Sequence, residues 1–191
     1  MFPGMSIHTA SKPSTSTGVC AIGLVGCASQ KLTRPAPARE LYVSQLFRKA
    51  SAYAELTCDR WYVLSAKHGV VHPDEILEPY DMRLGTNHRT TPPIHPWAAR
   101  VRDQMAVEFA GIENVKLIAL AGEQYRTVLL NSQWPSEVPM HGLGIGQQLG
   151  WLTAQLATGS HGGPMKVALN VIGGDPARRG CPPRNDLTRA L

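Results

Sequence analysis

Three short apolar segments, each ending in small or polar residues, alternate with segments whose apolar residues recur every three or four positions. The apolar segments cover residues 19–25, 60–66 and 115–122. Continuous apolar runs of this length are typical of strands that are covered on both faces, as in a parallel sheet. The sequence therefore predicts three parallel strands at the centre of the fold.

The segments between and after these strands have the periodicity of amphipathic helices. They span residues 41–55, 97–109 and 145–156. Strand and helix thus alternate in the order of an open α/β sheet, and a chain of 191 residues suits one domain. We predict a single three-layer α/β domain with a mostly parallel sheet and helices on both faces.

The two ends of the chain differ from this core in composition. Residues 1–17 are rich in Ser, Thr and Pro and predict a disordered arm, which leaves the α/β domain at 18–157. Residues 158–191 predict a flexible, Gly/Pro-rich basic tail, in which 166–172 has the pattern of one short strand. The tail holds five basic and two acidic residues and so carries +3 of the net charge of +5. Such a tail either binds nucleic acid without specificity or is simply solvated.

Several classes of protein are disfavoured by what the chain lacks. No run of about 18 apolar residues is present, so we expect no membrane partner. The first residues lack the apolar stretch of a secretory signal, which predicts a cytoplasmic protein. The four cysteines form no C-x-x-C pair, and we predict neither a metal site nor a cofactor.

Each predicted strand is followed by a cluster that joins small residues to functional ones: "GCASQK", "SAKHG" and "AGEQY". The carboxyl ends of parallel strands meet at one edge of a sheet, so the clusters should line one binding site. The predicted substrate-binding residues in them are Cys27, Ser29, Lys31, Ser65, Lys67, His68 and Glu123. Ordinary loops are polar too, and a buried structural role is the alternative for His68. Neither lysine cluster has the spacing of a Walker loop, which disfavours a nucleotide triphosphatase.

The segment 65–85 concentrates ionisable and aromatic residues between two prolines. Pro73 and Pro79 restrict the residues before them to extended backbone, which predicts a loop with a defined path. Glu78, Tyr80 and Asp81 lie around the second proline, and an aromatic ring beside a carboxylate suits recognition of a base or a sugar. The alternative is that Glu78 caps a turn and Tyr80 packs on the core.

Three glycines, Gly142, Gly144 and Gly146, precede or open the last predicted helix. They predict either close packing of backbone on the sheet or a helix N-terminus that faces an anion. No positive side chain accompanies the glycines, which favours packing.

The motifs Cys-x-x-x-Lys at 27–31, Ser-Ala-Lys-x-Gly at 65–69 and Glu-Pro-Tyr-Asp at 78–81 occur together in this chain. In this combination, residues 18–156 resemble an uncharacterised domain family of bacteria and phages. More remotely, that family is similar to the YaaA-like peroxide-stress proteins and to the uracil-DNA-glycosylase-like α/β fold. The resemblance implies binding of, or chemistry on, nucleobases or nucleic acid.

If the glycosylase-like resemblance holds, the residues can be fitted to cleavage of the N-glycosidic bond of a modified base. The reaction develops positive charge on the sugar and negative charge on the departing base. Asp81 or Glu78 would then be the catalytic anion or the base that activates water. Lys31, Lys67 and the backbone of 27–29 would hold phosphate, Tyr80 or His68 would stack on the base, and Glu123 would order a sugar hydroxyl or a ring nitrogen.

Two functions of other classes stay open. A non-catalytic nucleic-acid-binding or stress-response protein predicts salt-sensitive binding without turnover. A glycosyl transferase acting on free nucleotides or nucleosides predicts a small pocket and no affinity for polymer. A cysteine-based enzyme is less favoured, because Cys27 has no evident histidine partner, although Lys31 could acidify its thiol.

Overall fold

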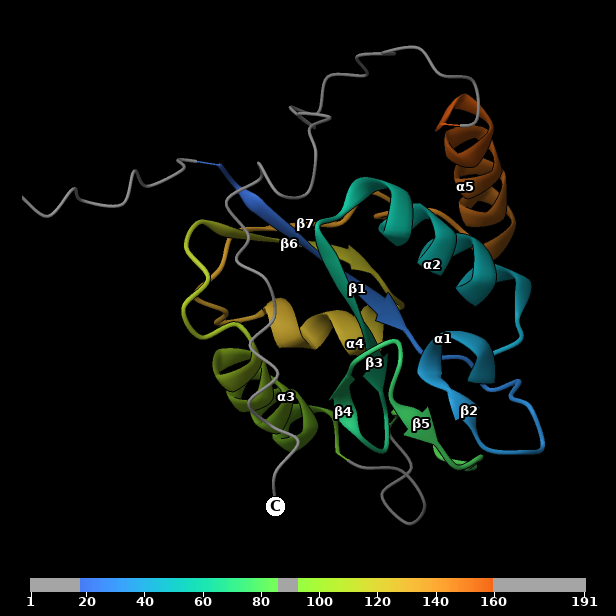
Figure 1. Ribbon diagram of the computed structural model, residues 1–191, viewed down its shortest axis with the longest axis horizontal. Helices are drawn as coiled ribbons and strands as arrows, with labels where there is room; N and C mark the ends of the chain where they lie inside the picture. Colours follow the sequence, from blue (N-terminus) through green and yellow to red (C-terminus); the bar gives the residue numbers. More distant parts are fainter. Residues whose placement is uncertain (1–17, 86–92, 160–191) are drawn as a thin grey trace, which may run out of the picture.

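The computed structural model describes residues 18–85 and 93–159, which fold around a five-stranded sheet (Figure 1). The sheet has the order β4-β3-β1-β6-β7. These strands span Gly69–Val71 (β4), Arg60–Ser65 (β3), Cys20–Gly26 (β1), Val115–Leu120 (β6) and Ser136–Glu137 (β7). Strand β1 is parallel to β3 and β6, β7 is parallel to β6, and β4 alone of these is antiparallel to its neighbour. The predicted α/β class with a mostly parallel sheet is confirmed.

The three central strands end at the same edge, as predicted. Val25 of β1 lies opposite Val63 of β3 and Leu120 of β6. One residue further on, a Cβ atom on Gly26 would lie 3.1 Å from the Cβ of Ala121. The segments that follow β1, β3 and β6 therefore emerge side by side.

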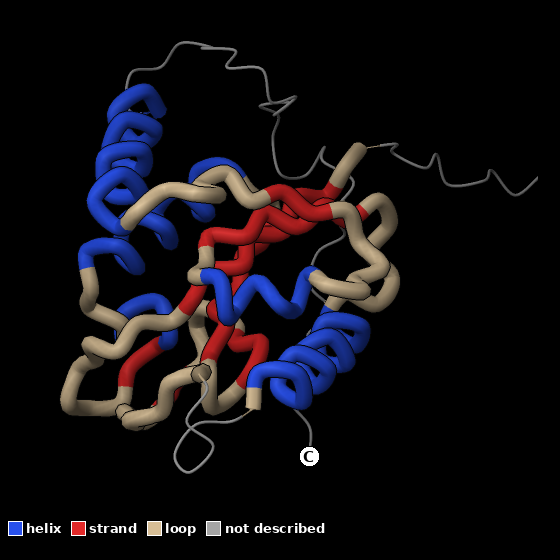
Figure 2. Tube along the Cα trace, turned by 180° about the vertical axis from the view of Figure 1, so that it is seen from behind, coloured by secondary structure: helices blue, strands red, loops and turns tan. Residues whose placement is uncertain are grey.

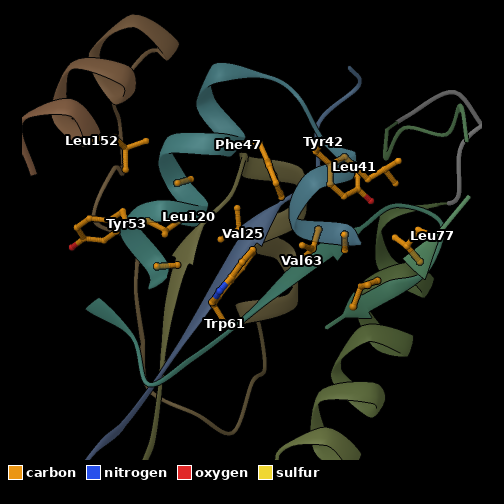
Figure 3. Close-up of a cluster of buried hydrophobic side chains, with 14 of the residues drawn as sticks. Val25, Leu41, Tyr42, Phe47, Tyr53, Trp61, Val63, Leu77, Leu120 and Leu152 are labelled. Carbon is orange, nitrogen blue, oxygen red and sulfur yellow. The ribbon is translucent and has the colours of Figure 1, made fainter. Parts of the chain in front are cut away.

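Helices cover both faces of the sheet, which explains why its strands are apolar on both sides. Helices α2 (Gln45–Thr57) and α5 (Ile145–Gly159) pack on one face, and α3 (Ile94–Glu108) packs on the other with the short α4 (Glu123–Arg126) and the 3₁₀ helix η1 (Thr127–Leu129) (Figures 1 and 2). On the first face, Phe47 of α2 and Leu152 of α5 join Val25 in one core cluster (Figure 3). On the second, Ile22 and Leu24 pack with Trp97 of α3.

The helix predicted over 41–55 is wrong at its start. Leu41 ends a separate short helix, α1 (Ala38–Leu41), and Tyr42 has extended backbone. Helix α2 then begins at Gln45, because the Ser44 hydroxyl accepts a hydrogen bond from the Phe47 N–H at 3.2 Å and so caps the first turn. The apolar spacing continues across this break, so periodicity alone does not reveal it.

Two small pairings organise the region predicted as an irregular loop. Strand β4 forms a hairpin with β3, and Gly69, the first residue of β4, has a φ of +83°, which favours glycine. Strand β5 (Ile76–Leu77) pairs with β2 (Ala36–Pro37) in a separate two-stranded sheet. Because both ends of the segment 69–77 are paired, the residues just after it, including Tyr80, have a fixed place.

Most of the two predicted flexible termini lie outside the described residues, as does the short strand expected at 166–172. Helix α5 continues to Gly159, slightly past the predicted boundary of the domain. Within 18–85 and 93–159, no helix has the length and apolar character needed to cross a membrane.

Candidate functional site

Tyr80 joins the end of strand β3 to the segment before helix α2. Its hydroxyl lies 2.7 Å from the Ser65 Oγ and 2.8 Å from the Tyr42 hydroxyl. Ser65 is fully buried, and its Oγ also accepts a hydrogen bond from the backbone N–H of His68 at 3.0 Å. The His68 ring packs edge-on against the Tyr80 ring, with centroids 5.3 Å apart. These contacts hold Tyr80 in one orientation.

Two lysines approach the ring of Tyr80 from different strand ends. The Lys31 Nζ lies 4.3 Å from the ring centroid and 5.6 Å from that of Tyr42, and the Lys67 Nζ lies 5.5 Å from the Tyr80 centroid. Lys31 is positioned by an isolated β-bridge between its backbone and that of Tyr42. The break between α1 and α2 therefore brings Tyr42 beside Lys31 and extends the site at this edge.

Cys27, directly after β1, contacts a third tyrosine. Its Sγ lies 3.2 Å from the hydroxyl of Tyr125, which comes from α4. The Tyr125 ring packs edge-on against Trp97, whose indole N–H donates to the Ser65 carbonyl at 3.0 Å. We call the residues gathered around the ends of β1 and β3 the edge site; they are Cys27, Lys31, Tyr42, Ser65, Lys67, His68, Tyr80 and Tyr125.

Burial changes the acid–base behaviour of the edge site. Burial raises the pKa of Tyr42 to about 12. Burial also raises the pKa values of Tyr80 and Tyr125, well above their usual range. A charge on Cys27 adds to the rise for each of the three tyrosines. All three hydroxyls therefore keep their protons at neutral pH. Burial also lowers the pKa of Lys31. The charges of Cys27 and Asp81 oppose this lowering, because they favour the charged form of the lysine.

His68 is neutral at pH 7 in this environment. Burial lowers its pKa from the usual 6.5, and the charges of Lys67 and Arg100 lower it further. Its Nε2 is out of reach of solvent and has no hydrogen-bond partner among the described residues. The ring therefore keeps a shielded, unpaired nitrogen within the edge site.

The two predicted catalytic carboxylates lie at the surface. Asp81 is exposed and acts on Lys31 through its charge. Glu78 is exposed as well. Neither carboxylate forms a hydrogen bond or an ion pair within the part of the chain that the structure describes. Ser29 is exposed, and it meets the site only through its carbonyl, which accepts a hydrogen bond from the Lys31 Nζ at 3.4 Å.

Glu123 does not join the edge site. It is the first residue of α4, and its exposed side chain lines a separate cavity of about 370 Å³ beside the edge site. The structure thus brings six of the predicted residues together and leaves Glu123 at this neighbouring cavity. Within the described residues, no group of three or more His, Cys, Asp or Glu side chains is placed to hold a metal ion. The prediction of no metal site stays a prediction.

Sequence reasoning missed Tyr42, Tyr125 and Trp97 as parts of this region. Tyr42 and Trp97 fell within the predicted helices 41–55 and 97–109, so neither was considered for the site. Tyr125 closes the cluster "AGEQY" that follows the third strand, so its position was a usable signal. Its partner Cys27 lies 98 positions away, a contact that no local pattern encodes.

The sequence of this domain matches a family model described as "Family of unknown function (DUF6884)" over residues 22–154. The chain belongs to this family. The matched range includes the whole edge site and the cavity beside it. The chain is also similar to the "Uncharacterized protein YfjM" of Bacillus subtilis (strain 168), with 32% identity over 114 residues, which cover 56% of this chain and 72% of that protein. The expected membership of an uncharacterised family is therefore confirmed.

Proposed function

We propose that this protein is a nucleobase- or nucleic-acid-directed enzyme that cleaves an N-glycosidic bond at the edge site. The observation that carries the proposal is the approach of Lys31 and Lys67, from two strand ends, to the ring of Tyr80, directly before the Asp81 carboxylate. Two cations can hold a phosphate, and a carboxylate next to them can stabilise positive charge on a sugar. The remote sequence resemblance to the uracil-DNA-glycosylase-like fold implies the same reaction.

In this proposal, the lysines anchor the phosphate of the substrate. A bound phosphate favours charged Lys31 and so offsets the lowering of its pKa by burial. Tyr80 supports the lysines, because Ser65 and Tyr42 engage its hydroxyl and Lys31 lies over its ring. His68, neutral and packed against the Tyr80 ring, is the residue that stacks on the base.

Asp81 is the catalytic anion in this mechanism, and Glu78 is its alternative. As the bond between the sugar and the base breaks, its electron pair leaves with the base and the sugar becomes cationic. The Asp81 carboxylate stabilises that cation or takes the proton of the water that attacks it. Both carboxylates are exposed, so each can meet a substrate that arrives from solution.

A second candidate is a nucleic-acid-binding or stress-response protein without catalysis. It is favoured by the absence of hydrogen bonds to Asp81 and Glu78 within the described residues, because catalytic carboxylates are usually oriented by partners. A transferase of free nucleosides or nucleotides is a third candidate and would use the same edge site.

One assay separates the three candidates. The full chain is incubated with single-stranded and duplex DNA carrying natural and modified bases, with tRNA, and with free nucleosides and nucleotides, and released base is measured by mass spectrometry. Release from polymer supports the glycosidase. Release or exchange of base from free nucleosides alone supports the transferase. Binding of DNA with a steep salt dependence and no release from any substrate supports the binding protein and overturns the proposal.

A further inference from the structure

A cavity of about 370 Å³ lies beside the edge site, between the end of β6 and the turn before α5. Its polar and glycine lining comes from two segments far apart in the sequence, namely Gly122, Glu123 and Arg126 on one side and Gly142, Gly144 and Gln148 on the other.

Arg126 contributes a buried donor to this region that lacks an acceptor. Its Nε is out of reach of solvent and has no hydrogen-bond partner among the described residues. The Arg126 side chain also lines the cavity, so its guanidinium is placed to meet an anion there. The planar guanidinium matches the oxygens of a phosphate better than any other side chain.

The opposite side of the cavity is the amino end of α5. Gly142 turns the chain with a φ of +76°, and Gly144 precedes the helix. The Gly144 N–H donates to the Gln147 Oε1 at 3.0 Å, but glycine has no side chain that could cap the N–H groups of the first turn. The first turn of this 15-residue helix also has no acidic residue, so its positive end is not neutralised there.

The glycines are not explained by close packing, which the sequence favoured. A Cβ atom on Gly142 or Gly146 would meet no heavy atom within 4 Å, and one on Gly144 would meet only the Gln147 Oε1, at 3.7 Å. That expectation is wrong, because the space beside these glycines is open. Arg126, from a segment distant in sequence, supplies the positive side chain that the glycine segment lacks.

The cavity and the edge site share helix α4. Tyr125 contacts Cys27 of the edge site, while Glu123 and Arg126 of the same helix line the cavity. Gly26 and Ala121 connect the two regions at the sheet edge. One extended substrate can therefore reach both.

We propose that this cavity binds a phosphate group, held by Arg126 and the amino end of α5. The inference rests on the proposed function, since the phosphate is one of the same nucleotide or nucleic-acid substrate. Glu123 also lines the cavity, but its carboxylate is exposed, so water screens its repulsion of a phosphate. The phosphate is either the terminal group of a nucleotide or an internal group of a polynucleotide.

The test measures binding of inorganic phosphate to the full chain by calorimetry, for the wild type and for Arg126→Gln and Gly144→Asp. Each variant should bind phosphate about tenfold more weakly or worse. Asp at the position before a helix is a favourable cap, so Gly144→Asp should fold and repel the anion through its charge. Gly144→Asn, of the same shape without charge, is the matched control and should bind within about threefold of the wild type.

Lys31 and Lys67 also attract anions, so the comparison is repeated with both changed to Gln. Wild-type affinity in Arg126→Gln and Gly144→Asp overturns the inference, and so does a wild-type chain that does not bind phosphate. If Arg126→Gln fails to fold, the difference between Gly144→Asp and Gly144→Asn decides. In a parallel arm, tighter binding of a nucleoside monophosphate than of a dinucleoside with one internal phosphate identifies a terminal group, and the reverse order identifies an internal one.

Failure of this inference is distinguishable from failure of the proposed function. If the chain releases base but its affinity for phosphate does not depend on Arg126, only the phosphate-site inference is overturned. If phosphate binding depends on Arg126 but the chain releases no base, the glycosidase proposal is overturned and the phosphate site is supported.

Discussion

The Tyr80 hydroxyl lies 2.7 Å from the Ser65 Oγ, and this contact ties the segment after β5 to the buried end of β3. Tyr80→Phe and Ser65→Ala should each lower the free energy of unfolding by about 1–2 kcal/mol, because each leaves a buried hydroxyl partner unsatisfied. The double variant should cost less than the sum of the two by about 1 kcal/mol. Urea denaturation measures all four corners of the cycle, and strictly additive losses would mean that the hydrogen bond does not couple the two residues.

Asp81→Asn should lower base release by about two to four powers of ten, since it removes the catalytic charge and keeps the side chain's shape. The carboxylate is exposed, so thermal unfolding should barely change. Glu113→Gln is the control, because Glu113 is also exposed but lies before β6, at the opposite edge of the sheet. Unchanged turnover in Asp81→Asn would mean either that Glu78 is the catalytic anion or that the proposed mechanism is wrong.

Lys31→Gln and Lys67→Gln should each weaken binding of a phosphate-bearing substrate and reduce the slope of log affinity against log salt by about one. Both lysines lie at the edge site, whereas Arg48 is exposed on α2. Arg48→Gln therefore removes the same charge elsewhere and should leave the slope nearly unchanged. Equal salt slopes in all three variants would show that the lysines do not contact the phosphate.

His68 should make the protein less stable in mild acid. Its pKa is lowered in the folded state, so the unfolded chain binds the proton more readily. The stability that it contributes is present above the unfolded pKa of about 6.5 and is lost as the pH falls toward the folded pKa. Comparison of unfolding curves at several pH values between 7 and 5 should show a smaller loss in His68→Gln than in the wild type; identical losses would contradict the shift.

Two glycine substitutions should have opposite effects. In Gly23→Ala the new Cβ would lie 3.1 Å from the Cβ atoms of Ala54 and Trp61, and we expect a loss of about 1–3 kcal/mol from overpacking between β1 and α2. In Gly150→Ala it would meet no heavy atom within 4 Å, so α5 should gain about 0.5–1 kcal/mol from helix propensity. Thermal unfolding checks both, and a stable Gly23→Ala would show that α2 can move away from the sheet.

The order and type of the main elements follow from local patterns in the sequence. Apolar runs and helical periodicity are local records of burial, so they located β1, β3, β6, α3 and α5 and placed the segments after the strands at one edge. From that rule alone, Lys31, Ser65 and Lys67 were expected to meet, and they lie around Tyr80. The two prolines predicted a loop with a defined path, and the fixed position of Tyr80 agrees with that prediction.

Which side chains complete the edge site, and which lie at the cavity beside it, depends on tertiary packing. Tyr42 reaches Tyr80 across 38 positions and Tyr125 reaches Cys27 across 98, through a capped helix break and a crossover between strands. Glu123 and Tyr125 follow the same strand, yet the short helix α4 directs one to the cavity and the other to the edge site. Local patterns report whether a residue is buried, whereas the partner that it meets depends on how distant segments pack, because contact energies act between neighbours in space and not along the chain.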